Sequence, residues 1–264
     1  MERDAMEPKA LPPLDVEALR RGLAGLRLGQ PLIYLPAIGS TNTYAGDLAQ
    51  AGVAEGALVT TDDQTAGRGR VGRVWKALPG QQLALSLILR PTFPPHFLVM
   101  ASALAVAQAI EAVAGVRPDI KWPNDVLLGG RKVCGILIET SEGVAVLGMG
   151  VNVNGALDDD PELATRATTL AAFVGHVISR EALAVEILRR LDARYLDLLE
   201  GGPQARRTLR ADWRDRLVTL GRRATIHQRE ATLAGVAEDV DDDGALLLRQ
   251  DDGRLTTVLW GDVE

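Results

Sequence analysis

A segment rich in glycine and arginine, TAGRGRVGRVWKALPG (65–80), is the strongest sign of chemistry in this sequence. Three glycines alternate with three arginines between positions 67 and 73. Glycine lets the backbone approach a ligand closely, and arginine supplies a positive charge with forked donors for phosphate or carboxylate. It is neither a Walker loop nor a strand-to-helix GxGxxG turn, because arginines stand where those motifs place small residues. We interpret it as an anion-binding loop; the alternatives are a solvated basic loop and an RG-type nucleic-acid contact.

A second signal is IKWPNDVLLGGRKVCGILIE (120–139), in which Lys132 begins the return strand of a predicted hairpin. Strict alternation places Lys132 on the face of Cys134 and puts Gly135 on the opposite face. A lysine beside so apolar a strand either extends its ammonium into water or meets an anion. The segment therefore predicts a cation at a site, and an ordinary hairpin lysine in water is the alternative.

Two weaker signals are GMGVNVN (148–154) and GSTNT (39–43). Glycines inside an apolar strand often mark the close approach of a ligand or another backbone. Asn152 interrupts that strand, and a buried amide needs hydrogen-bond partners. GSTNT offers hydroxyls and an amide at a strand-to-helix corner, although the same residues are ordinary helix caps.

Composition limits the class of protein. Hydrophobic residues make up 47% of the 264, enough for a sizeable core, and the net charge of −6 argues against general affinity for nucleic acid or anionic membrane. The single cysteine, Cys134, allows no internal disulfide, and the charged, proline-containing start does not read as a secretory signal. The apolar stretch 97–114 contains polar residues and is interpreted as a buried helix. We expect a cytoplasmic protein.

Periodicity and turn residues predict an α+β body followed by a small all-β module. From residue 217 onward short strands are separated by DDDG and DDG turns. Helices are expected over 15–27, 42–51, 97–115, 180–201 and 204–216, and strands over 32–38, 57–64, 82–90, within 120–139 and over 144–154.

The order of these segments resembles the biotin–protein ligases, also called biotin–acetyl-CoA-carboxylase ligases. GSTNT is followed by Gln64 with GRGRxGRxW, then by KWPND with RKVCGILIE, then by GxGVNVN. The specific motifs cover about residues 30–155, and a weaker resemblance continues to the end. Val71 occupies a position that is often basic in the family, which we expect to alter loop charge and not chemistry.

The resemblance implies a mixed sheet flanked by helices, of the class II aminoacyl-tRNA-synthetase-like kind, with a C-terminal barrel like a Src-homology-3 domain. It implies an N-terminal extension over 1–30, a catalytic domain over 31–216 and the barrel over 217–264. The region before the first predicted strand is too short for the helix-turn-helix domain of bifunctional relatives, so we expect the monofunctional type.

The resemblance also implies a role for individual residues. The catalytic cations would be Lys132, Arg68 and Arg70. The biotin site would comprise Ser40, Thr41, Asn42, Gln64, Arg68, Gly69, Arg70, Lys132 and Gly135. The ATP and adenylate site would comprise Arg70, Arg73, Trp75, Asn124, Lys132 and Asn152, with no protein metal ligands.

The implied reaction is ATP-dependent biotinylation of a lysine through biotinyl-5'-AMP. Biotin and ATP are the substrates, Mg²⁺ accompanies the nucleotide, and the partner is a biotin carboxyl carrier protein of acetyl-CoA carboxylase or of a related biotin-dependent carboxylase. We expect no DNA or membrane partner, and a homodimer is possible.

Three other functions fit the sequence less well. Lipoate or octanoate transfer would need an apolar tunnel, whereas GSTNT and Gln64 suit a polar ureido ring. A biotin-responsive repressor would need a DNA-binding domain. An RNA-binding protein would need exposed aromatic platforms, but aromatic residues are only 4% of the chain, and its charge is negative.

Overall fold

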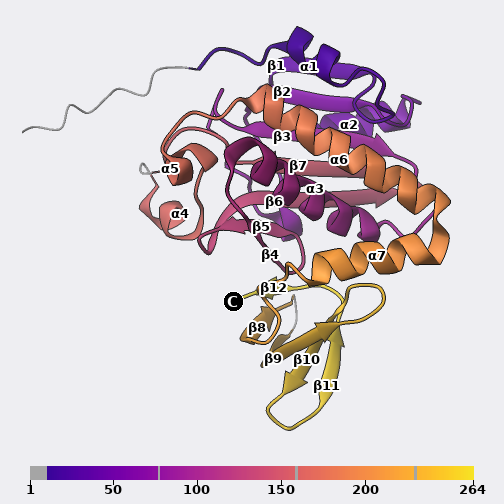
Figure 1. The fold of residues 1–264 in the computed structure, drawn as a ribbon, viewed down its shortest axis with the longest axis vertical. Helices are drawn as coiled ribbons and strands as arrows, with labels where there is room; N and C mark the ends of the chain where they lie inside the picture. Colours follow the sequence, from indigo (N-terminus) through magenta and orange to yellow (C-terminus); the bar gives the residue numbers. More distant parts are fainter. Residues whose placement is uncertain (1–10, 77, 158–159, 229–230) are drawn as a thin grey trace, which may run out of the picture.

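The structure is a computed structural model that describes residues 11–264 except 77, 158–159 and 229–230. A larger α+β body is followed by a small module, which lies beneath α7 in Figure 1. The helices are α1 (Val16–Gly22), α2 (Thr41–Gln50), α3 (His96–Ala114), α4 (Pro161–Arg166), α5 (Leu170–Val174), α6 (Arg180–Glu200) and α7 (Gly202–Arg214).

A seven-stranded mixed sheet forms the body, in the order β1-β2-β3-β7-β6-β5-β4. The first two strands pair in parallel, and every other neighbouring pair is antiparallel. Its strands are β1 (Leu32–Ile38), β2 (Leu58–Gln64), β3 (Leu83–Leu89), β4 (Asp119–Lys121), β5 (Asp125–Leu128), β6 (Arg131–Ser141) and β7 (Val144–Val151).

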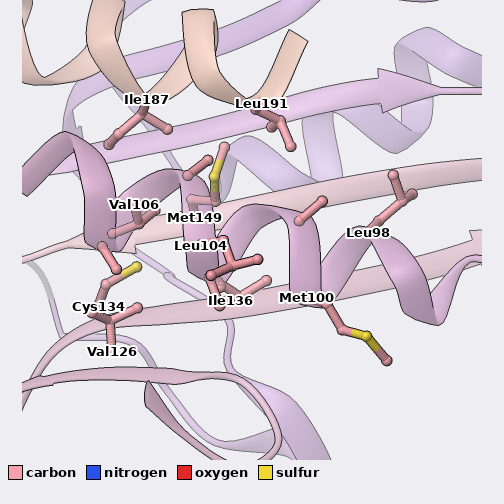
Figure 2. Packing of buried hydrophobic residues seen from close by; sticks show 14 of the residues in the cluster. Leu98, Met100, Leu104, Val106, Val126, Cys134, Ile136, Met149, Ile187 and Leu191 are labelled. Carbon is pink, nitrogen blue, oxygen red and sulfur yellow. The ribbon is translucent and has the colours of Figure 1, made fainter. Parts of the chain in front are cut away.

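One face of the sheet carries the main core. Figure 1 shows α3 and α6 lying across this face, and Figure 2 shows leucine, valine and isoleucine side chains of both helices against the strands. By length and composition α3 resembles a membrane span, but 67% of its most apolar window is buried inside the protein. As the sequence indicates, α3 is a core helix, and Gly115 ends it in the left-handed conformation.

The opposite face is covered only in part, by α2. Ala45 of α2 packs with Val59, Ile88 and Val146 of the strands beneath it. Farther along the same strands the side chains on this face become very small. Because alternate residues of a strand face opposite sides, apolar residues fill the α3 side while small ones leave a hollow on the α2 side.

The C-terminal module is a five-stranded antiparallel sheet in the order β11-β10-β9-β8-β12. It is fastened to the body at β4, where the Trp122 indole donates to the Gly244 carbonyl over 3.0 Å. The predicted fold class is therefore confirmed. Its strands are β8 (Arg223–His227), β9 (Thr232–Val240), β10 (Leu246–Gln250), β11 (Leu255–Val258) and β12 (Asp262–Val263).

Two stretches differ from the sequence-based expectation. The helix expected over 15–27 begins as predicted, with the Asp15 carboxylate capping the Ala18 amide, but it ends at Gly22 and gives way to turns. The sequence pattern does not predict α4, which begins within the acidic stretch 156–162, or α5, which follows it. Both are short, and their N-caps are Asp160 and Thr169.

Candidate active site

The hollow on the α2 side forms a pocket over β3, β7 and β6, roofed by the Gly/Arg loop and closed at one end by the C-terminal module. Its polar lining comes from segments far apart in the chain, including the start of α2, the end of β2 and the β5–β6 hairpin. All of the predicted site residues except Asn152 line this pocket. The structure thus brings together motifs that the sequence holds up to 95 positions apart, from Ser40 to Gly135.

Glycines form the floor. Gly135 of β6 stands directly opposite Gly150 of β7 in the antiparallel register, and the Trp75 indole lies on both. A Cβ atom would come within 2.9 Å of the indole at position 135 and within 2.6 Å at position 150. The indole Nε1 donates to the Gln82 amide oxygen over 3.1 Å. Only glycine at these two positions lets a flat ring approach the sheet so closely.

Uncharged polar side chains gather around the start of α2; those of α2 and β3 are buried, and Gln64 at the end of β2 is partly buried. Ser40 caps the helix through its hydroxyl, and the next residue, Thr41, contacts the Gln64 amide oxygen with its backbone nitrogen and its hydroxyl, at 2.9 and 3.0 Å. Ser86 Oγ lies 2.8 Å from the Thr41 hydroxyl and 2.6 Å from the Asn42 amide oxygen. We call Thr41, Asn42, Gln64 and Ser86 the neutral end of the pocket.

Gly148 supports the neutral end from below. A Cβ atom there would come within 2.2 Å of the Asn42 amide oxygen, a contact that no real structure tolerates without movement. The amide nitrogen of Asn42 donates to Glu139 over 3.0 Å. Asn42 is therefore confined by its neighbours above, below and beside it, and its amide has one satisfactory orientation.

The other end of the pocket is cationic, and two of its cations, Arg73 and Lys132, are paired with carboxylates from other elements. The Arg73 guanidinium lies 2.6 Å from Asp262, whereas Arg68 of the same loop lies beside the neutral end, 2.7 Å from Glu139. In both ion pairs the arginine and the carboxylate are partly exposed, so water competes for each of these charges. The Lys132 ammonium lies 2.7 Å from Asp125 and 5.6 Å from the Trp75 ring centroid.

Arg70 differs from the other cations of the loop. Its guanidinium donates to two neutral oxygens, the Asn124 side-chain carbonyl at 2.5 Å and the Gly261 backbone carbonyl at 3.3 Å. Burial lowers the pKa of the Arg70 guanidinium, and the nearby charges of Asp262 and Asp125 act in the opposite direction. Arg70 has carbonyl oxygens and no carboxylate in direct contact, so an anion in the pocket gains more from Arg70 than from a cation already in an ion pair.

The side of the strand on which Lys132 lies was predicted wrongly. Strict alternation put Lys132 with Cys134, but the ammonium lies beside Gly135, whose Cβ would come within 2.9 Å of it. The reason is a register shift in the β5–β6 hairpin: Leu127 pairs with Lys132 and Val126 with Cys134, so Val133 is an extra residue. A bulge of this kind re-aims the side chain that precedes it, here into the pocket.

With this geometry in place, comparisons with known proteins are informative. Residues 34–155 match the Biotin/lipoate A/B protein ligase family, and residues 219–264 match the Biotin protein ligase C terminal domain. The Biotin--[acetyl-CoA-carboxylase] ligase of Mycobacterium tuberculosis is 36% identical over 273 residues, which cover 99% of this chain and 98% of that protein. The chain belongs to the biotin protein ligase family.

Two further relatives support this membership. The Bifunctional ligase/repressor BirA of Bacillus spizizenii is 38% identical over 261 residues, covering 95% of this chain and 79% of that protein. The structure of the biotin protein ligase from Aquifex aeolicus in complex with biotin and ATP superposes with a TM-score of 0.77, at 26% identity, covering 88% of this chain and 97% of that one. The resemblance seen in the sequence motifs is confirmed.

Asn152 is the one predicted site residue of this ligase that lies outside the pocket. It is buried, and its side-chain amide donates to the Thr168 carbonyl over 3.2 Å, while its backbone nitrogen donates to Val133. Cys134 faces the core and is fully buried, and burial raises the pKa of its thiol. The expectation that Cys134 is a packed hydrophobe agrees with this environment.

Sequence reasoning missed several polar residues of the ligase pocket. Ser86 sits in an apolar strand and carried no motif, and Asp262 lies near the end of the C-terminal module. Asp125, which lines the pocket, and Glu139, which lies beside it, are within the quoted motifs but were given no role. Three signals were usable: Ser86 is the one hydroxyl in β3, Asp125 begins β5, and Glu139 lies in β6, the strand that carries Lys132.

Proposed function

We propose that this ligase joins biotin to ATP as biotinyl-5'-AMP and then transfers the biotinyl group to a lysine of a biotin carboxyl carrier protein. The observation that carries the proposal is the division of one pocket into a buried neutral end and a cationic end. The named activity of the relatives and the biotin and ATP in the Aquifex aeolicus structure support it.

The neutral end suits the ureido ring of biotin, which offers one carbonyl oxygen and two N–H donors. Thr41, Gln64 and Asn42 supply hydroxyl and amide groups at fixed positions, and all are held by further hydrogen bonds. A lipoyl group has no ureido ring, so it would exclude water from these polar groups without offering them a hydrogen bond in return. The neutral end therefore favours biotin over lipoate.

The cationic end suits the first chemical step, in which the biotin carboxylate attacks the α-phosphorus of ATP and pyrophosphate leaves. Two anions must meet, so repulsion between them is the obstacle. Lys132 lies between the glycine floor and the loop, where its ammonium and the Arg70 guanidinium can contact both anions. A unit charge pair at 4 Å contributes about 4 kcal/mol at an effective dielectric constant near 20.

Mg²⁺ belongs to the proposal as a companion of the nucleotide. No cluster of three His, Cys, Asp or Glu side chains occurs among residues 11–264 apart from the undescribed positions, but the Asp125 carboxylate lines the pocket beside Lys132. One carboxylate there fits an ion that is held mainly by phosphates. When bound, Mg²⁺ would supply positive charge that favours departure of pyrophosphate.

The second step needs shelter, because biotinyl-5'-AMP is a mixed anhydride that water hydrolyses. The Gly/Arg loop covers the pocket, and its closure excludes water from the acyl carbon. A deprotonated lysine amine of the carrier attacks that carbon, the bond to the phosphate oxygen breaks, and AMP leaves. The chain supplies no covalent nucleophile in this scheme, which agrees with the burial of Cys134.

The remaining parts of the proposal concern the whole protein. We assign residues 31–216 to catalysis, 217–264 to a supporting module and the cytoplasm as the compartment. Asn124 would face the nucleotide from the pocket wall, and Ser40, Gly69 and Trp75 would contact biotin or its adenylate. No DNA or membrane partner is part of the proposal, and a homodimer is compatible with it.

The test is biotin-dependent exchange of labelled pyrophosphate into ATP by the purified protein. Exchange is expected with biotin and absent with lipoate. Labelled biotin, and not labelled lipoate, should then appear on a lysine of apo carrier protein. Failure of biotin to support exchange would refute the proposed reaction, and exchange supported by lipoate would reverse the choice of substrate.

A further inference from the structure

Glu139 contacts both the Gly/Arg loop and the start of α2, and the proposed reaction gives it no role. It lies near the end of β6, outside every residue set assigned above, with about a third of its side chain exposed. Its two carboxylate oxygens have different partners. Oε1 accepts from Arg68 of the Gly/Arg loop at 2.7 Å, and Oε2 accepts from the Asn42 amide at the start of α2 at 3.0 Å.

The Asn42 contact determines how that amide is turned. A carboxylate can only accept hydrogen bonds, so it requires the Asn42 nitrogen on its side. The Asn42 oxygen then faces Ser86, whose hydroxyl lies 2.6 Å away. Without the carboxylate the two orientations of the amide would differ much less in free energy, since a hydroxyl both donates and accepts.

The Arg68 contact fastens the loop at the same place. Besides Glu139, the Arg68 guanidinium reaches the Thr43 hydroxyl at 3.4 Å, so the loop is docked on the first turn of α2. Arg68 is half exposed, and its ion pair is the kind that opens and closes readily in water. Loop docking and amide orientation thus share one carboxylate.

We propose that Glu139 is a positioning residue that couples closure of the Gly/Arg loop to the orientation of the Asn42 amide in the biotin pocket. This inference rests on the proposed function, because Asn42 matters as a contact for the ureido ring. Glu139 contacts neither reacting atom. It acts through two residues that do bind ligand, and its loss weakens biotin binding while leaving the chemical step intact.

The test compares Glu139→Gln with a matched control, Glu142→Gln. Glutamine has the size of glutamate, but its amide N–H group cannot accept a hydrogen bond from Arg68 or Asn42, so one of the two contacts is lost. Glu142 is an exposed glutamate in the turn between β6 and β7, three residues after Glu139, so its substitution changes the net charge equally. Unfolding temperatures are measured first, to show that the variants and the wild type are equally folded.

Two readouts separate positioning from general damage. In Glu139→Gln the Kd and KM for biotin should rise by about five- to tenfold, as for a lost charged hydrogen bond in a half-exposed site, with kcat at saturating biotin within about twofold of wild type. In the ligand-free protein, tryptic cleavage after Arg68, Arg70 and Arg73 should accelerate at least about fivefold, with cleavage at Arg189 on α6 unchanged. The control should match wild type in both.

A second pair of variants tests the coupling itself. In an Arg68→Met background the loop has already lost its partner, so Glu139→Gln should add no further cleavage at Arg70 and Arg73. Acceleration by the same factor in both backgrounds would overturn the proposal. So would wild-type biotin affinity in Glu139→Gln, or equal acceleration of cleavage at the loop and at Arg189.

The proteolysis experiment does not depend on the reaction. A wild-type protein without biotin-dependent pyrophosphate exchange would refute the proposed function while the loop contact remained measurable. Normal exchange with no effect of Glu139→Gln would refute only the positioning role.

Discussion

The two ends of the pocket hold their polar groups in opposite ways. At the neutral end, Thr41, Asn42 and Ser86 are at most 6% exposed, and their hydrogen bonds connect directly to strands of the sheet. At the cationic end, the Lys132 and Arg73 side chains are 32% and 66% exposed, and each is paired with a carboxylate, Asp125 and Asp262 respectively.

This difference teaches how one pocket handles two kinds of ligand group. A neutral head group gains affinity from donors and acceptors that are already in place, because little ordering remains to be done on binding. Anionic groups instead bind where the cations form weak ion pairs that another anion can replace. The attraction between these cations and the ligand is strongest once the loop has excluded water. The neutral end is expected to control affinity and the cationic end to control rate.

The largest effect is expected from Lys132→Ala at the cationic end. Removing the ammonium should lower the rate of biotinyl-5'-AMP formation by roughly 100- to 1,000-fold, the effect of deleting one group that stabilises a transition-state charge. The variant should still fold and bind biotin. Single-turnover formation of the adenylate and calorimetric titration with biotin, then ATP, measure the two properties.

Lys121→Ala provides the control for this prediction. Lys121 ends β4, outside the lining of the pocket, so its substitution removes a lysine without touching the site. Full adenylate formation by Lys132→Ala would show that this cation is not needed for the reaction. The cationic end would then not control the rate, and the proposed difference between the two ends would be wrong.

An intermediate effect is expected from Gly148→Ala at the neutral end. The new methyl group would come within 2.2 Å of the Asn42 amide oxygen and must displace it. Overpacking of this kind amounts to about 1–3 kcal/mol, so the Kd for biotin should rise between about fivefold and 150-fold. The rate constant of adenylate formation at saturating biotin should change little, because no cation has moved.

Gly46→Ala is the matched control, because a Cβ atom at that position in α2 meets nothing within 4 Å. It should bind biotin normally and be slightly more stable, as alanine is a better helix former than glycine. If Gly148→Ala lowered the rate constant and left affinity unchanged, the division of labour between the two ends would be wrong.

The smallest effect is expected from Asp262→Asn, which removes the carboxylate that holds Arg73. An exposed ion pair contributes about 0–1 kcal/mol, so activity should change by less than about fivefold, and the difference should shrink as salt is added. Asp251→Asn, which breaks an exposed pair with Arg223 elsewhere in the same module, should have no effect on activity. A change at Asp262 larger than that at Gly148 would contradict the comparison.

The sequence could predict most of the elements, the family and many of the residues that line the pocket, because these depend mainly on local patterns. The apolar run of β3, the Gly115 stop of α3 and each family motif carry their information within short windows. The direction of Lys132 could not be predicted, since a single extra residue at Val133 reverses the alternation. A bulge depends on the pairing of two strands, which no single strand reveals.

Long-range partners were also beyond the sequence. Glu139 and Asn42 are 97 positions apart, and Arg73 and Asp262 are 189 apart. Such pairs become neighbours only when the sheet and the C-terminal module assemble. Asn152 is a different case: its motif predicts a ligand contact, which stays a prediction, and in the folded chain its amide nitrogen donates to the Thr168 carbonyl.

The Trp75 indole, which lies against Gly135 and Gly150, gives the ligase an intrinsic fluorescent reporter in the pocket. Trp122 and Trp213 are buried in the core, and their emission should stay constant while the pocket fills. Trp75 lies beside the Lys132 ammonium and belongs to the Gly/Arg segment, so its fluorescence should respond to ligand entry in a Trp260→Phe variant, which lacks the partly exposed fourth tryptophan. Stopped-flow emission after mixing with biotin would then follow loop closure in real time, with no attached dye.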